Sequence, residues 1–292
     1  MTSQNSKSGP STLGVAAAFA AIYVIWGSTY LAIKYAVETL PPLMMAGTRF
    51  VAAGLILYAF VRLRGVPRPS RLHWRSTAII GGLLLLGGNG GVVWAEQTVP
   101  SSVAALLITS VPIWMVLVEW LRPGGTKPRA AVAAGVVLGF AGVVMLVGSK
   151  DVGDGQALDR VGALILVCGS FCWSLGSVWS RSMKLPSSPL MVTAMEMLCG
   201  GVMLLAAGLT IGEASEISAD RISLLSVLSL VYLLVFGALV AFTSYVWLLK
   251  VSTPARVSTY AFVNPVVAVL LGVTVGGEPF GGKTVLASVV IL

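Results

Sequence analysis

Residues 223–249 read SLLSVLSLVYLLVFGALVAFTSYVWLL, a stretch without one charged side chain. A helix needs about 20 mostly apolar residues to cross a hydrocarbon core of roughly 30 Å. A membrane-spanning strand would instead alternate polar and apolar residues, and this stretch does not. The segment therefore predicts a transmembrane helix.

Similar apolar runs lie on both sides of this segment. After a polar tail over 1–13, we expect helices at 14–36, 42–61, 77–97, 101–121, 129–148, 159–180, 188–211, 223–249, 255–275 and from about 281. The first run is full length, so we expect it to be retained rather than cleaved as a signal peptide. The last run reaches Leu292 after about a dozen residues, too few to span, so we expect the given sequence to end inside the tenth helix.

The composition excludes a sizeable soluble domain. Hydrophobic residues make up 57% of the chain and charged residues 10%, with a mean hydropathy of +0.92. Soluble domains carry about 25% charged residues. The net charge of +8 might suit nucleic acid, but the charges are scattered over short connections, which topology explains better. We expect no nucleic-acid partner.

Cysteine and histidine, two residue types that bind metals, are rare in this chain. Cys168, Cys172 and Cys199 lie inside apolar runs without His or carboxylate neighbours, and the only histidine, His73, is expected in a basic loop. We interpret the cysteines as packing residues rather than a redox or metal pair, and expect no metal and no cofactor.

The basic residues predict the orientation. If the amino terminus is cytoplasmic, thirteen of the nineteen Lys and Arg residues fall on the cytoplasmic side, four on the other side and two within helices. This distribution follows the positive-inside rule. We therefore expect both termini in the cytoplasm and a multi-pass membrane protein.

Rare residues recur at fixed spacings and indicate an internal repeat. Trp26 and Trp173 are 147 residues apart, and Pro112 and Pro265 are 153 apart. Chance similarity is the alternative. Five helices in each half would place the second half upside down relative to the first. We predict an all-α integral membrane protein with ten transmembrane helices as two inverted five-helix repeats, at 14–148 and 159–292, joined by an extracytoplasmic linker at 149–158.

Several short motifs resemble those of a known family. The stretch 26–34 (WGSTYLAIK), Asn264-Pro265 and Gly277-Glu278-Pro279 resemble marks of the EamA branch of the drug/metabolite transporter superfamily, and most closely bacterial amino-acid exporters of the YddG type. The resemblance covers essentially the whole chain and implies export of small metabolites by a multi-pass protein of the bacterial inner membrane. The chain departs from many relatives at 120–123 (WLRP), where they carry a Gly-Glu pair.

Two ionisable residues lie deep within predicted helices. Arg49 and Glu196 are 147 residues apart and thus equivalent in the proposed repeat. Such residues are costly in lipid and usually face a cavity or a partner. Structural pairing, a gate element, and a substrate or proton site all remain open for them.

The prolines and a set of aromatic and polar residues complete the candidate site. Pro112 and Pro265 each remove a helical hydrogen bond, so they are hinge candidates, with static kinks as the alternative. We expect a substrate cavity lined by Trp26, Tyr30, Asn89, Trp94, Trp173, Ser177, Tyr245, Tyr260 and Asn264. For the tryptophans an interfacial belt is the alternative. Aromatic walls with few polar anchors suit a zwitterionic, partly apolar solute.

These features predict a secondary transporter that exports amino acids or related small metabolites by alternating access. No GxxxxGK[ST] loop occurs, so energy would come from gradients. The alternatives are an exporter of other drug-like solutes, a membrane-embedded lipid-processing enzyme and a channel-like subunit. An enzyme would need clustered acid, base or metal-binding groups, and the predicted spans lack them. The sequence indicates no oligomeric state, and a monomer is compatible with it.

Overall fold

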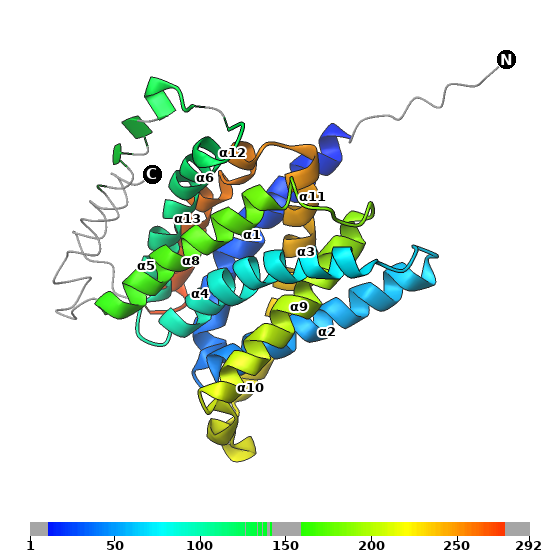
Figure 1. The fold of residues 1–292 in the computed structure, drawn as a ribbon. Helices are drawn as coiled ribbons and strands as arrows, with labels where there is room; N and C mark the ends of the chain where they lie inside the picture. The colour runs from blue at the N-terminus through cyan, green and yellow to red at the C-terminus, as the bar shows by residue number, and fades with distance from the viewer. Residues whose placement is uncertain are drawn as a thin grey trace.

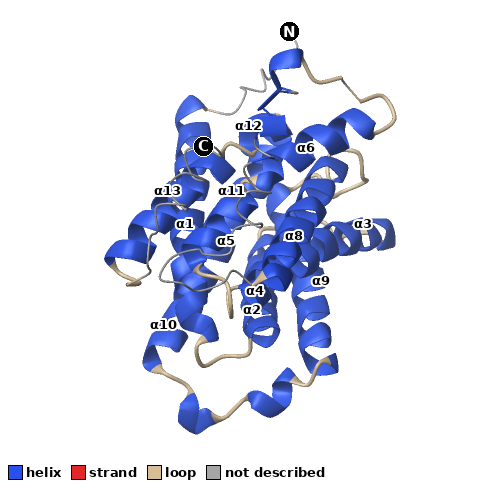
Figure 2. Ribbon diagram, turned by 90° about the vertical axis from the view of Figure 1, so that its left-hand side faces the viewer, coloured by secondary structure: helices blue, strands red, loops and turns tan. Residues whose placement is uncertain are grey.

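The computed structural model describes residues 11–277, apart from 126, 133, 136, 139–140 and 142–158. This part is helical, without a strand, and contains eight helices long and apolar enough to cross a membrane (Figures 1 and 2). The predicted linker and tenth helix lie outside the described residues, as do most of the tail and of the fifth helix. The described part is therefore an all-α bundle of membrane-spanning length.

Four spans precede residue 142 and four follow residue 158. The first four are α1 (Thr12–Val37), α2 (Pro42–Leu63), the consecutive segments α3 (Arg71–Gly81), η1 (Gly82–Asn89) and α4 (Gly90–Ala95), and the pair α5 (Ser101–Ile108) and α6 (Ser110–Leu121). The others are α8 (Arg160–Trp179), α9 (Pro189–Thr210), the segments α10 (Leu224–Tyr232), η4 (Leu233–Phe242) and α11 (Thr243–Val251), and the pair α12 (Pro254–Val257) and α13 (Tyr260–Thr274). Two short 3₁₀ turns, η2 (Glu213–Glu216) and η3 (Ala219–Arg221), follow α9.

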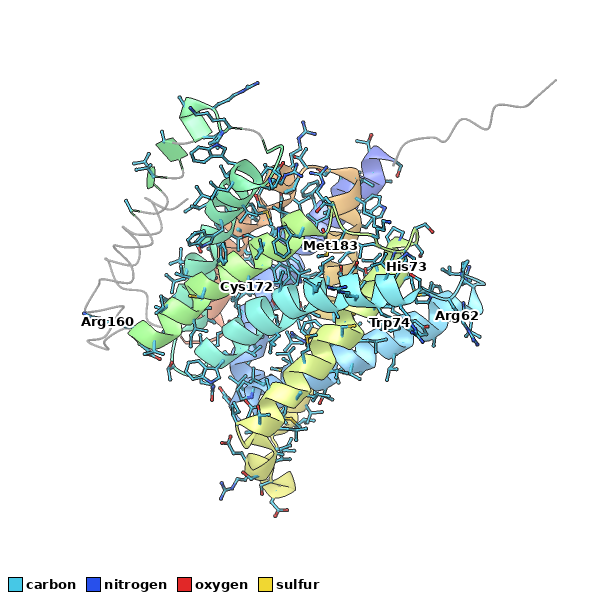
Figure 3. The ribbon with its side chains drawn as sticks, in the orientation of Figure 1. Arg62, His73, Trp74, Arg160, Cys172 and Met183 are labelled. Atoms are coloured by element: carbon cyan, nitrogen blue, oxygen red, sulfur yellow. The ribbon has the colours of Figure 1, made fainter. Side chains whose placement is uncertain are left out.

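Small polar residues determine where several helices begin. The side-chain oxygens of Ser11, Ser70, Asp159 and Ser223 each accept a hydrogen bond from a backbone N–H of the following first turn. At Ser70 this cap starts α3 six residues before the predicted position. His73 lies in that first turn, as Figure 3 shows, so its assignment to a loop was wrong.

The outward faces of the helices are apolar. Leu55, Ile56, Leu224, Leu228 and Leu270 are all more than half exposed. In water such a continuous apolar surface would favour aggregation, whereas in a bilayer it contacts lipid tails. The exposed faces thus agree with the membrane location that the composition predicted.

Glycines bring α2 and α9 into close contact. A side-chain carbon on Gly54 would lie 2.9 Å from the side chain of Leu198, and one on Gly201 would lie 2.8 Å from the backbone of Val51. Gly201 is 147 residues after Gly54, and Leu198 is 147 residues after Val51. The same contact therefore occurs twice, with the roles of the two helices exchanged.

Two spans contain a π-helical segment, η1 in the third and η4 in the span from Leu224 to Val251. π-helical turns are rare and frequently occur at functional sites because they widen the helix and redirect side chains. The sequence analysis did not predict these segments. Both supply residues to the cavity described below.

A buried carboxylate joins the turn after α9 to the start of α2. Glu213 accepts hydrogen bonds from the backbone N–H groups of Leu43, at 3.1 Å, and Met44, at 2.8 Å. The residue before α2, Pro41, offers no side-chain cap. Glu213 therefore satisfies two of the N–H groups that a helix start leaves without intrahelical partners.

Candidate functional site

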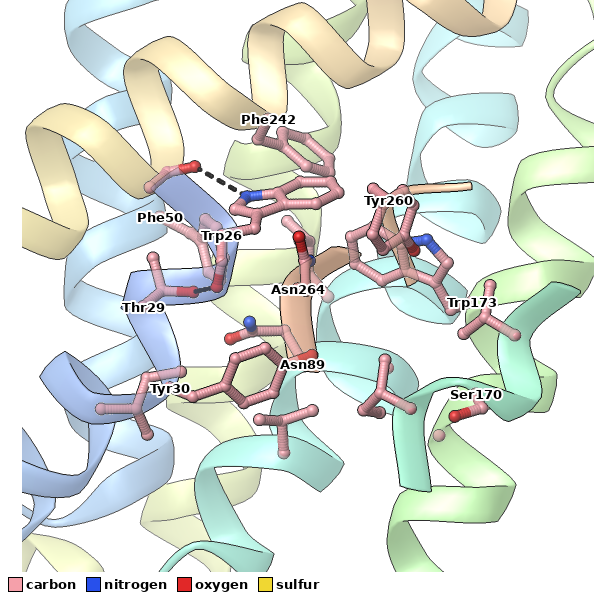
Figure 4. Close-up of a pocket in the computed structure, with 18 of the residues that line it drawn as sticks. Trp26, Thr29, Tyr30, Phe50, Asn89, Ser170, Trp173, Phe242, Tyr260 and Asn264 are labelled. Carbon is pink, nitrogen blue, oxygen red and sulfur yellow. Dashed lines mark hydrogen bonds between the residues drawn. The ribbon is translucent and has the colours of Figure 1, made fainter. Parts of the chain in front are cut away.

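A central cavity lies among helices from both parts of the chain. It encloses about 80 Å³, which is room for several water molecules or part of a small solute. Its most prominent side chains are shown in Figure 4: Trp26, Thr29, Tyr30, Phe50, Asn89, Ser170, Trp173, Phe242, Tyr260 and Asn264, with Arg49 also in the lining.

Trp26 is the centre of the aromatic wall. Its ring centroid lies 5.5 Å from that of Trp173 and 5.0 Å from those of Tyr245 and Tyr260. The Trp26 Nε1–H donates to the backbone oxygen of Gly237 in η4, at 3.4 Å. Edge-to-face and tilted ring pairs of this kind are favourable and hold the rings in fixed positions. The wall therefore presents a rigid apolar surface to the cavity.

Arg49 brings a positive charge to this cavity. Its Nη2 donates to Asn89 Oδ1 at 2.7 Å, and its guanidinium carbon lies 4.3 Å from the centre of the Phe50 ring. The side chain is only 3% exposed, and its Nε has no hydrogen-bond partner among the described residues. A guanidinium has donors in a fork that matches a carboxylate, so the cavity combines an apolar wall with one anion-binding group.

Tyr245 lies behind the cavity wall and is completely buried. Its hydroxyl accepts a hydrogen bond from Trp173 Nε1 at 2.8 Å and shares another with Ser177 Oγ at 2.5 Å. Asn264 is held in place similarly, because its amide nitrogen can donate to the backbone oxygens of Tyr23 and Tyr260. These bonds fix the positions of the side chains around the cavity.

A second cavity, here called the Glu196 cleft, lies beside the connection between α8 and α9. It encloses about 380 Å³ and is lined by residues of that connection, of α9 and of α11. Glu196 is 1% exposed, and its Oε2 has no hydrogen-bond partner in the described part of the chain. Arg181 and Lys250 also line the cleft, and Lys250 Nζ donates to the backbone oxygen of Pro186 at 3.3 Å.

The structure places the predicted site residues in three groups. Six line the central cavity: Trp26, Tyr30, Asn89, Trp173, Tyr260 and Asn264. Ser177 and Tyr245 are buried behind it. Trp94 lies near the end of α4 and lines neither cavity.

The two prolines lie in different backbone environments. A break at Thr109 separates α5 from α6, and Pro112 lies three residues after Thr109. Pro265 lies inside the continuous helix α13, and the nearest break is at Ser258 and Thr259. The two prolines are therefore equivalent in the sequence repeat, but the helix breaks near them lie at different distances.

Several lining residues were not predicted from the sequence. Phe50 and Phe242 line the central cavity, and Arg181 and Lys250 line the cleft. One signal was available for Phe242, since it lies 153 residues after Asn89, the same spacing as between the prolines. Among the described residues, no three His, Cys, Asp or Glu side chains gather in a way that could hold a metal ion.

Comparison with known proteins gives consistent results for sequence and fold. The EamA-like transporter family matches residues 12–148 and again 160–292. An "Uncharacterized inner membrane transporter YedA" of Escherichia coli is 42% identical over 259 residues, covering 88% of this chain and 81% of that protein. A "Probable amino-acid metabolite efflux pump" of the same species is 24% identical, covering 93% of this chain and 90% of that protein.

A solved structure with the same fold is among the matches. It is described only as "Crystal structure of protein", with a TM-score of 0.67 at 23% identity, covering 96% of this chain and 94% of that one. The sequence relatives are transporters rather than enzymes. The alternative of a membrane-embedded lipid-processing enzyme is therefore excluded.

Proposed function

Because this chain belongs to the EamA-like transporter family, we propose that it is a secondary transporter exporting amino acids or related small metabolites across the bacterial inner membrane. The observation that carries the proposal is the buried Arg49 in an aromatic cavity. The relative described as a probable amino-acid metabolite efflux pump supports the same substrate class.

The chemistry of the central cavity suits a small carboxylate with an apolar side chain. Arg49 offers donors to a carboxylate, while Trp26, Trp173 and Tyr260 contact apolar groups without directional demands. The cavity is small, so a solute of modest size fits better than a large drug-like molecule. This argument favours amino acids and similar metabolites over other exported solutes.

The proposed mechanism is alternating access between two inverted five-helix repeats, in a ten-span chain with both termini in the cytoplasm. The exchanged contacts of Gly54 and Gly201 support a two-fold relation between the halves. Two further observations support it, the π-helical segment in each half and the separate family matches to 12–148 and 160–292. Inverted repeats let one bundle rock against the other around a fixed central site.

Counterflow in proteoliposomes tests the function. Vesicles containing the purified protein and one unlabelled amino acid are diluted into the same labelled amino acid, and each of the common amino acids is tried in turn. We expect saturable accumulation for at least one apolar or aromatic amino acid without added nucleotide. Protein-free vesicles are the control, and absence of saturable exchange for every amino acid would refute the proposed substrate class.

A further inference from the structure

The Glu196 cleft presents charges of both signs to one cavity. Glu196 is almost fully buried, with one carboxylate oxygen unpartnered among the described residues, whereas Lys250 and Arg181 are exposed. No ion pair between Glu196 and Lys250 is found within the described part, where Lys250 Nζ donates to the Pro186 backbone oxygen. A buried carboxylate oxygen without a hydrogen bond is costly, and it is usually matched by a cation, a proton or a ligand.

The cleft and the central cavity lie next to each other. Leu84 lines the cleft, and its neighbour Leu85 in η1 lines the central cavity. In the span from Leu224 to Val251, Val246 lines the cleft, whereas Phe242, one helical turn before it, lines the central cavity. Tyr245 lies between those two positions in the sequence and is bonded to Trp173 and Ser177. Tyr245, Trp173 and Ser177, here called the Tyr245 layer, therefore adjoin residues of both cavities.

We propose that the Glu196 cleft is a second binding site, which takes a zwitterionic solute with its ammonium group on Glu196 and its carboxylate toward Lys250 and Arg181. The solute would bind here before it passes the Tyr245 layer into the central cavity. This inference rests on the proposed function, and it adds an ammonium-recognising group that the central cavity does not provide in its described lining.

The arrangement of charges orients the solute. The carboxylate of Glu196 lies deep in the cleft, so an ammonium group must enter first and a carboxylate remains near the exposed cations. In the central cavity the charged group is Arg49, which attracts the carboxylate of the same solute. Only the cleft therefore recognises the ammonium group, and a carboxylic acid without an ammonium group lacks the contact with Glu196.

Binding to the purified full-length protein tests the assignment with three probes that share one side chain: phenylalanine, phenethylamine and 3-phenylpropionate. In Glu196→Gln, we expect the affinity for phenethylamine and phenylalanine to fall at least about tenfold, because a charged hydrogen bond is lost. The affinity for 3-phenylpropionate should not change. Glu216→Gln, an exposed carboxylate on the turn after α9, is the matched control and should change none of the three.

A second measurement does not depend on the folding of Glu196→Gln. Ser180 lines the cleft, so a cysteine at this position is covered when the cleft is occupied. The variant Ser180→Cys is made in a chain whose three native cysteines, Cys168, Cys172 and Cys199, are replaced. Its rate of reaction with a thiol reagent then measures the occupancy of the cleft. Phenethylamine should slow that reaction in a saturable manner. An unchanged reaction rate overturns the proposal.

The remaining outcomes separate this inference from the proposed function. If counterflow is saturable while Glu196→Gln leaves all three affinities unchanged, the cleft proposal is wrong and the transport proposal stands. If the variant instead loses only proton movement coupled to transport, Glu196 is a proton site and the binding proposal is also overturned. Loss of amine binding without any amino-acid counterflow leaves the cleft assigned and removes the proposed substrate class.

Discussion

Arg49 and Glu196 occupy corresponding places in α2 and α9, yet the two side chains have different surroundings. Arg49 bonds to Asn89 and lies against Phe50 in the central cavity. Glu196 lines a larger cleft with an unpartnered oxygen and two cationic side chains nearby. The backbone positions are related by one spacing of 147 residues, whereas the charges are opposite.

This difference teaches that a repeat can conserve packing while its functional groups diverge. The helix contact between α2 and α9 uses equivalent residues in both directions. Packing constrains those positions because a side chain on either glycine would clash. The cavity positions carry no such constraint, so each half can offer a different group to a solute that crosses from one face to the other.

The largest expected effect concerns the orientation of the chain, that is, which loops lie on the cytoplasmic side of the membrane. In a chain without other cysteines, Ala214→Cys should react with an impermeant thiol reagent from outside the cell, while Arg68→Cys should react only after permeabilisation. Both positions are exposed, so access to the reagent decides the result. The physical reason is the excess of Lys and Arg on the side of Arg68. If Arg68→Cys reacts from outside and Ala214→Cys does not, the predicted orientation is wrong.

The next effect concerns the charge in the central cavity. Arg49→Gln should weaken binding of the transported amino acid by about 2 kcal/mol, or roughly thirtyfold, because a charged hydrogen bond to its carboxylate is lost. The dependence of counterflow on concentration measures this change. Arg160→Gln, at an exposed arginine, is the control. Equal half-saturation in Arg49→Gln and the unchanged protein would mean that Arg49 serves only to hold Asn89.

A smaller effect is expected from the two prolines. Their replacement tests whether the two halves contribute differently to the conformational change. Pro112→Ala and Pro265→Ala should shift the balance between inward-open and outward-open states in opposite directions, by about 1 kcal/mol or less. The reaction rate of a cysteine at Ser180, in the cleft, reports the shift. Because only Pro112 lies at a helix break, its effect should be the larger. Shifts in the same direction would make both prolines static kinks.

A separate effect, on stability rather than on transport, concerns the buried hydroxyl of Tyr245. Tyr245→Phe removes the hydroxyl bonded to Trp173 and Ser177 and should lower the free energy of unfolding by about 1–3 kcal/mol, because buried polar groups lose a partner. Thermal unfolding in detergent measures the loss. Tyr58→Phe is the control, since no hydrogen bond of its hydroxyl is found among the described residues, where its ring packs against Trp74. A melting temperature equal to that of the control would show that the layer is not held by these bonds.

The sequence predicted the helices well and the local details of the site less well. Apolar runs between polar caps determine the spans, so the helix predicted at 188–211 differs by one residue at each end from α9, Pro189–Thr210. Period and hydropathy do not distinguish a π-helical segment from an α-helix, so η1 and η4 were missed. Deep charges marked Arg49 and Glu196 as special, but only the packing of distant helices assigns them to separate cavities.

The bond between Glu213 and the start of α2 has a consequence for biogenesis. The residues that it joins are separated by 170 positions in the chain. At a synthesis rate of about 5–20 residues per second, α2 waits roughly 10–30 seconds after it leaves the ribosome before its carboxylate partner exists. During that interval the N–H groups of Leu43 and Met44 depend on water or lipid headgroups. The start of α2 therefore acquires its buried carboxylate cap only after the later half of the chain has been made.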